Sequence, residues 1–173
     1  MNSVRSSSGE DARRAFERLY VAHRADVVRW GLRYGAGRSA WAEDLAQDVF
    51  LRLHGHLQTL ERVEDLAPWL YRTTANCALN RLRNEKSWTG ALARLFRSES
   101  DDAPGPEMKL AGRESVLKAL RALPPKERMV LCMKVLDGKS QQEIAEALEL
   151  SEGYVSKLTA RAWELIEEVR DEA

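Results

Sequence analysis

Residues 140–166, SQQEIAEALELSEGYVSKLTARAWELI, restrict the fold most, because they predict two short helices joined by a tight turn. Ser140 and Glu143 have the spacing of a capping box, in which each side chain satisfies a backbone N–H at the start of a helix. Ala145 is small where the helices would cross, and Leu150 would fill the turn. The pattern predicts a helix-turn-helix, with an ordinary helical hairpin as the alternative.

The apolar positions of these helices repeat every three or four residues, which is the period of one helix face. They are Ile144, Ala145, Leu148, Val155, Leu158, Ala162, Leu165, Ile166 and Val169. Glu149 stands at the turn, where glycine is usual, and would be strained there at a positive φ angle. The outward side of the second helix is a candidate DNA-reading surface. Its members are Ser151, Glu152, Gly153, Tyr154, Ser156, Lys157 and Arg161.

The charge balance limits what this motif can do alone. The chain has 27 Lys and Arg against 27 Asp and Glu, so its formal net charge is zero. Non-specific DNA affinity comes mainly from neutralising phosphates, which requires an excess of basic side chains. We therefore expect weak DNA binding by the free protein, and a second component that holds it at DNA.

The rest of the chain predicts an all-α protein of two small helical domains joined by a flexible linker. Only 10 Gly and 5 Pro interrupt the 173 residues, and three helical runs cover about residues 11–34, 39–57 and 65–86. The stretch RSESDDAPGPE has clustered acids and no apolar periodicity, which indicates a flexible acidic linker. The expected division is a disordered tail at 1–9, a first domain at 10–90, the linker at 91–112 and a second domain at 113–173.

Several classes of protein are excluded by simple features. No apolar run approaches the roughly 20 residues of a membrane span, and the N-terminus lacks the apolar region of a secretory signal. Cys77 and Cys132 have no CxxC spacing. His54 and His56 have no evident third ligand, and no phosphate-binding or nucleophile motif occurs. We expect a cytoplasmic protein with reduced thiols, no metal, no cofactor and no enzymatic activity.

The second helical run, residues 39–57, has an apolar stripe and a distinct outward face. Asp44, Gln47, Asp48 and Leu51 share that face at a spacing of three or four residues. A leucine among acidic side chains suggests a protein contact, although a single exposed leucine is also common on ordinary surfaces. Both interpretations remain open from the pattern alone.

The third helical run carries a polar face. Its members, at helical spacing, are Trp69, Arg72, Thr73, Asn76, Asn80 and Arg83. Amides and arginines bind base edges and phosphates, and an aromatic ring can support an unstacked base. The face therefore suits nucleic acid, and the alternative is a solvated polar face with Trp69 in the core.

Three segments together resemble the sigma-70 family of RNA polymerase subunits. They are AEDLAQDVFLRL at 42–53, APWLYRTTANCALNRLRN at 67–84 and LPPKERMVLCMKVLDGKSQQEIAEALELSEGYVSKLTARAWELI at 123–166. Over residues 12–170 their order and spacing are similar to the small two-domain members, the extracytoplasmic-function (ECF) sigma factors. The resemblance implies a protein that binds core RNA polymerase, through its β′ and β subunits, and recognises the −10 and −35 elements of promoter DNA.

The resemblance also implies a role for each face. The polymerase-binding residues would be Glu43, Asp44, Gln47, Asp48 and Leu51. The residues that recognise and melt the −10 element would be Arg62, Trp69, Arg72, Thr73, Asn76, Asn80, Arg81 and Arg83. Residues 60–67 match the loop that captures a flipped base, and the outward side of the helix after Leu150 matches the reader of the −35 element. An anti-sigma factor is a further implied partner.

Two positions depart from the family pattern. Residues 156–159 read Ser-Lys-Leu-Thr where Lys-Ser-Arg-Leu is frequent, so Lys157 would take over a phosphate contact. Asn80 stands where an acidic residue is frequent. The alternative functions are a free-standing helix-turn-helix regulator and, more remotely, a helical adaptor or enzyme. Residues 10–90 argue against such a regulator, because they lack the alternating strand pattern of a receiver domain.

Overall fold

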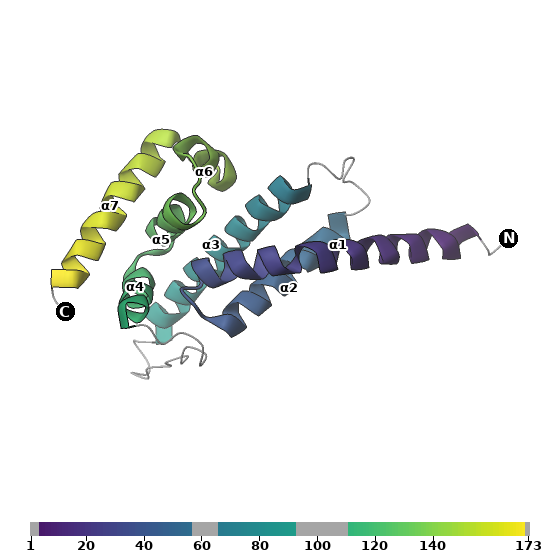
Figure 1. Cartoon of the computed structure of the whole chain (residues 1–173), viewed down its shortest axis with the longest axis horizontal. Helices are drawn as coiled ribbons and strands as arrows, with labels where there is room; N and C mark the ends of the chain where they lie inside the picture. Colours follow the sequence, from purple (N-terminus) through teal and green to yellow (C-terminus); the bar gives the residue numbers. More distant parts are fainter. Residues whose placement is uncertain (1–3, 57–65, 93–110, 172–173) are drawn as a thin grey trace.

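The computed structural model describes residues 4–56, 66–92 and 111–171, and every regular element within these ranges is a helix. The elements are α1 (Val4–Tyr34), α2 (Ser39–His56), α3 (Leu66–Leu92), α4 (Ala111–Ala122), α5 (Pro125–Leu131), the π-helical turn η2 (Cys132–Leu136), α6 (Gln141–Leu148) and α7 (Glu152–Asp171). Figure 1 shows α4 to α7 gathered on the left of α1, α2 and α3. The predicted all-α fold with two helical domains is confirmed.

The N-terminal domain forms because α1, α2 and α3 each bury an apolar face. The apolar stripe of α2 is covered, and Leu45, Val49 and Leu53 have no solvent exposure at all. Gly31 of α1 permits a close crossing with α2, since a Cβ atom at Gly31 would lie only 3.1 Å from the Cα of Ala42. This packing leaves the opposite face of α2 in solvent.

The C-terminal domain contains the predicted helix-turn-helix. The N–H of Glu143 donates to Ser140 Oγ at 3.1 Å, and the N–H of Ser140 donates to Glu143 Oε2 at 2.8 Å, which completes the capping box at the start of α6. Glu149 ends α6 with a φ of 55°, so the turn does require the left-handed backbone. Ser151 Oγ accepts from the N–H of Tyr154 at 3.3 Å and caps α7.

The helix before α6 ends irregularly. The regular turns of α5 widen into η2, where the N–H of Asp137 bonds the carbonyl of Cys132 at 3.1 Å. Such π-helical turns occur frequently at functional positions. Gly138 follows with a φ of 67°, a conformation that only glycine adopts without strain.

Helix boundaries differ from the sequence-based expectation in three places. α1 already includes residues 4–9, which were expected to be a disordered tail; no proline interrupts them. α3 continues to Leu92 and α4 begins at Ala111, so both extend into the expected linker. The remainder of that linker, and most of the predicted loop with Arg62, lie outside the described residues.

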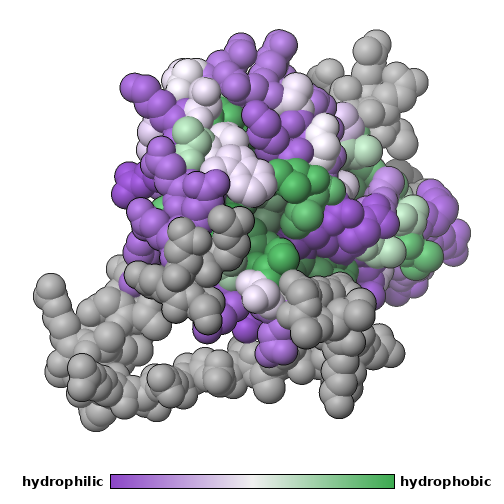
Figure 2. Space-filling view, turned by 60° about the vertical axis from the view of Figure 1, so that its left-hand side comes forward, coloured by the Kyte–Doolittle hydropathy of each residue, from purple (hydrophilic) through white to green (hydrophobic). Residues whose placement is uncertain are grey.

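The two domains lie against each other and share one buried core. α3 packs on α5 and α6, and α1 contacts η2. Figure 1 shows α5 and α6 beside α3. Figure 2 shows a mostly hydrophilic surface with one apolar area near the centre of the face turned forward. Because α6 packs on α3, the contact between the domains brings the helix-turn-helix next to α3.

Candidate functional site

The outward face of α2 is the first candidate surface. The five predicted polymerase-binding residues are all exposed on it: Glu43, Asp44, Gln47, Asp48 and Leu51. The side chain of Leu51 is 65% exposed. Arg24 of α1 forms an ion pair with Glu43 at the edge of this face. The face combines acidic groups with one exposed apolar side chain, a composition that suits a partner with basic and apolar groups.

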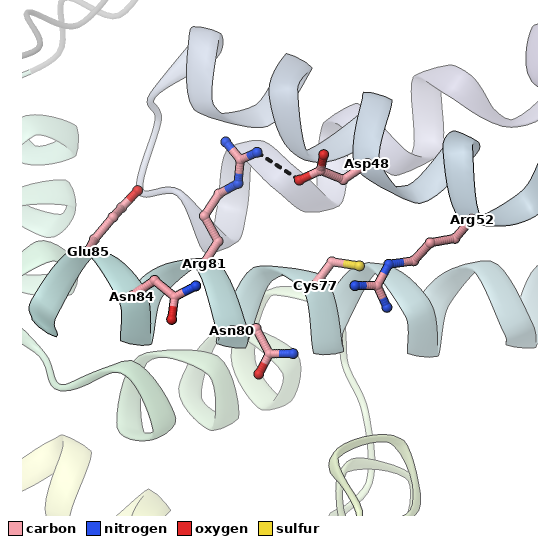
Figure 3. A pocket seen from close by; sticks show the side chains of 7 residues that line it. All are labelled: Asp48, Arg52, Cys77, Asn80, Arg81, Asn84 and Glu85. Carbon is pink, nitrogen blue, oxygen red and sulfur yellow. Dashed lines mark hydrogen bonds and ion pairs between the residues drawn. The ribbon is translucent and has the colours of Figure 1, made fainter. Parts of the chain in front are cut away.

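Arg81 of α3 points toward the same face. Its Nη2 lies 2.7 Å from Asp48 Oδ2 and its Nη1 lies 3.4 Å from Asp44 Oδ2. Figure 3 shows the side chain directed at α2. Burial lowers the pKa of Arg81, but the hydrogen bonds to Asp48 and Asp44 outweigh this effect and hold the pKa above its ordinary value. Arg81, predicted to bind DNA, thus contacts two residues predicted to bind polymerase.

A cavity of about 420 Å³ opens between α2 and α3 beside this ion pair (Figure 3). Its lining residues are Asp48, Arg52, Cys77, Asn80, Arg81, Asn84 and Glu85. Arg52 and Asn84 were not among the predicted residues, although they lie one helical turn after Asp48 and Asn80 and could have been found by that spacing. Amide and guanidinium groups around an open cavity can bind base edges or phosphates.

The predicted −10 residues of α3 differ in their exposure to solvent. The exposed ones are Arg72, Asn80 and Arg83, and the half-buried ones are Trp69, Thr73, Asn76 and Arg81. Trp69 packs edge-on against His56, with ring centroids 5.7 Å apart. Asn76 donates from Nδ2 to the carbonyl of Ala147 in α6 at 3.0 Å. Asn76, like Arg81, is therefore engaged within the protein itself.

The outward side of α7 is the second candidate surface. All seven predicted residues are exposed: Ser151, Glu152, Gly153, Tyr154, Ser156, Lys157 and Arg161. Lys126 Nζ donates to Tyr154 Oη at 3.3 Å and stands 4.9 Å from the centre of its ring. Arg161 Nε lies 3.6 Å from Glu127 Oε1. Lys126 adds a basic group that the prediction missed, because its position depends on the packing of α5 against α7.

His54 and His56 pack against aromatic rings, those of Phe16 and Trp69. Within the described ranges, no group of three or more His, Cys, Asp and Glu side chains could hold a metal ion. No helix among the same residues is long and apolar enough to cross a bilayer.

Two family models match this chain, Sigma-70 region 2 over residues 19–88 and Sigma-70, region 4 over residues 113–165. The probable RNA polymerase sigma factor RfaY of Xanthomonas campestris is 31% identical over 129 residues, which cover 71% of this chain and 32% of the relative. The chain thus spans about a third of that relative's length. The ECF RNA polymerase sigma factor SigW of Bacillus subtilis is 28% identical over 143 residues, covering 75% of this chain and 76% of the relative.

Solved structures share the fold over most of the chain. The sigma factor RpoE, in complex with the anti-sigma factor NepR from Bartonella quintana, gives a TM-score of 0.65 at 18% identity, covering 91% of this chain and 97% of its own. CnrH, in complex with the cytosolic domain of CnrY, gives 0.58 at 23% identity, covering 92% of this chain and 90% of its own.

Proposed function

Because this chain belongs to the sigma-70 family and is of the ECF type, we propose that it directs promoter-specific transcription initiation by binding core RNA polymerase and promoter DNA. The observation that carries this function is the succession of the two matched regions, 19–88 and then 113–165, each on its own helical domain. The protein supplies recognition and has no catalytic activity of its own. Its working compartment is the cytoplasm, where polymerase and promoter are found.

The exposed face of α2 is the proposed contact with polymerase, whose β′ and β subunits are the protein partners. Asp44, Gln47 and Asp48 are held in solvent because the opposite face of α2 is buried. Complementary charge speeds encounter and sets the register of such a contact. Leu51 adds apolar area at the same place, which strengthens a contact once water is excluded.

The face of α3 is proposed to recognise and melt the −10 element, together with the loop that contains Arg62. Strand opening requires an unstacked base to be held, at a cost of a few kcal/mol for each base that leaves the stack. Asn80, Arg72 and Arg83 are exposed on α3 and can bind bases and phosphates. The ring of Trp69 can support a base only after it leaves its half-buried position beside His56.

The first turns of α7 are proposed to read the −35 element from the major groove. Ser156, Lys157 and Gly153 are exposed there, while Leu158 is only 4% exposed and belongs to the core. Lys157 is then the basic residue of this turn. Since the chain carries no net charge, polymerase has to provide most of the affinity that keeps α7 on DNA.

An anti-sigma factor is the further proposed partner, and the sigma factor RpoE, which shares this fold, has been solved in complex with one. A free-standing helix-turn-helix regulator is not favoured, because residues 19–88 match region 2. The proposed division remains a region 2-like domain at 10–90, a linker at 91–112 and a region 4-like domain at 113–173.

Reconstitution with purified core polymerase tests the proposed function. We expect the protein to co-purify with core enzyme and to start transcription from a subset of fragments of its source genome. Sequencing those transcripts would then identify the promoters. Neither co-purification nor initiation from any fragment would show that the proposed function is wrong.

A further inference from the structure

Asp137, at the end of η2, is buried in the contact between the two domains. Its side chain is only 3% exposed, although it belongs to a helix end. Oδ2 accepts from the hydroxyls of Tyr34 at 2.7 Å and Tyr71 at 2.9 Å, and Oδ1 is paired with Arg33. All three partners belong to the N-terminal domain, in α1 and α3. One carboxylate of the C-terminal domain is therefore satisfied entirely by the other domain.

The two tyrosines are suited to this role. Burial raises the pKa of Tyr34 and of Tyr71 well above the ordinary value, so both hydroxyls keep their protons and remain donors. Hydrogen bonds to a charged acceptor are stronger than those between neutral groups. A buried carboxylate that loses its partners is costly, so Asp137 favours the state in which the domains touch.

Further bonds along the same contact join the two domains at α3 and at the end of α1. Asn76 donates to the carbonyl of Ala147 in α6, and Arg121 donates to the carbonyl of Ala36 at 3.2 Å. The thiol of Cys132 lies 3.6 Å from the carbonyl of Arg33. Asn76 belongs to the proposed −10 surface, so α6 occupies a position that melted DNA would need.

Arg128 opposes this attraction from the C-terminal side of the contact. It is only 7% exposed, and its Nε has no hydrogen-bond partner among the described residues. Burial, and then repulsion from Arg38 of the N-terminal domain, lower its pKa to about 10. Arg38 is itself paired with Glu85. A buried, incompletely satisfied cation destabilises the closed contact.

We propose that Asp137 with its three partners is a latch that holds the C-terminal domain over α3, and that the buried, incompletely satisfied Arg128 weakens the closed state enough for it to open. The closed state blocks Asn76 and keeps the free protein from melting DNA, a consequence that rests on the proposed function. The latch itself does not rest on it. The alternative to this proposal is that the contact between the domains never opens in the free protein.

Two labels can report the distance between the domains. His23 of α1 and Glu146 of α6 line one cavity of about 600 Å³ at the contact, and neither belongs to a proposed binding surface. Both are changed to Cys in a Cys77→Ser background and labelled with a donor and an acceptor dye. Cys132 is fully buried and burial raises the pKa of its thiol to about 12, so it should stay unlabelled, as mass spectrometry would verify.

We expect a different change in energy transfer for each of three single substitutions. Asp137→Asn should lower transfer by raising the ratio of open to closed molecules about tenfold, which corresponds to about 1.4 kcal/mol. Arg128→Met should raise transfer above the wild-type level, because it removes the buried cation. Asp26→Asn is the matched control and should change nothing, since Asp26 lines the same cavity but pairs with Arg29 of its own helix.

Circular dichroism establishes that each variant is folded. A folded Asp137→Asn variant with unchanged transfer would refute the latch. Should that variant not fold, Tyr71→Phe removes one of the bonds to Asp137, and unchanged transfer in it would refute the latch equally. Adding core polymerase to the wild-type protein should lower transfer. If Asp137→Asn lowers energy transfer but the protein does not bind core polymerase, the latch is supported and the proposed function is contradicted. The failure of the latch and the failure of the proposed function can therefore be distinguished.

Discussion

The turn of the helix-turn-helix offers a sharp test of how its backbone is held. Glu149 is exposed and lies at a φ of 55° and a ψ of 46°. A left-handed conformation costs an L residue roughly 1–2 kcal/mol, whereas glycine loses roughly 0.5–1 kcal/mol more conformational freedom on folding. We therefore expect Glu149→Gly to raise the free energy of unfolding by about 0.5–1 kcal/mol, the difference between these effects.

Glu146 provides the matched control, because it is exposed and lies three residues earlier in the right-handed turns of α6. Glu146→Gly should lower the free energy of unfolding by about 0.5–1 kcal/mol. Glu149→Gln keeps the side chain at positive φ but removes an acid from the C-terminal end of α6, which separates strain from charge. Urea unfolding followed by circular dichroism measures all three variants. Equal losses for the two glycine variants would refute the reasoning, since position 149 would then carry no strain.

Four further outcomes are expected. Asp44→Arg combined with Asp48→Arg should abolish binding to core polymerase in a pull-down while leaving the helical circular dichroism intact; retained binding would remove α2 from the docking surface. Asn80→Ala should reduce open-complex formation, read by permanganate reactivity, more than closed-complex binding, and an equal loss in both would argue against a melting role. Lys157→Ala should weaken protection near −35 in holoenzyme footprints, whereas an unchanged footprint would exclude Lys157 from the reader. Hydrogen bonds from Lys139 and then Ser140 lower the pKa of Glu143 from 4.5 to about 2. The contribution of this carboxylate to stability is therefore present above pH 4.5 and is lost as the pH falls toward 2. The difference in urea stability between wild type and Glu143→Gln should shrink over that interval, and it would be constant if the carboxylate contributes nothing.

The local features of this fold can be read from the sequence because they depend on neighbours in the chain. The capping box of Ser140 and Glu143 requires only residues three apart, and both of its hydrogen bonds are present. The buried and exposed faces of α2 follow from helical spacing in the same way. Even the strain at Glu149 was visible as a missing glycine in a turn.

The contact between the domains could not be predicted from the same patterns. Asp137 lies 103 residues from Tyr34 and 66 from Tyr71, and helical periodicity gives no information about partners at such distances. As a sequence feature, Asp137 before Gly138 is an ordinary helix end. The direction of Arg81 depends likewise on how α3 crosses α2, so its pairing with Asp44 and Asp48 was not expected. Side chains that connect separate helices are therefore where this sequence was least informative.

A neutral chain that reads DNA at promoters is more selective if its basic groups do not bind random DNA. Arg33, Arg38 and Arg81 each pair with a carboxylate of their own protein, and these pairs lie at the domain contact or beside α2. Such pairs lower the charge available for non-specific phosphate binding, which would otherwise hold the free protein on random DNA. Since Asn76 is also engaged by α6, the domain contact removes both the charge of Arg33 and a base-reading amide from the free protein. Opening of the latch would make this charge and this amide available again at the moment when polymerase supplies the remaining DNA contacts. The neutral net charge and the closed arrangement would then both reduce binding to random DNA.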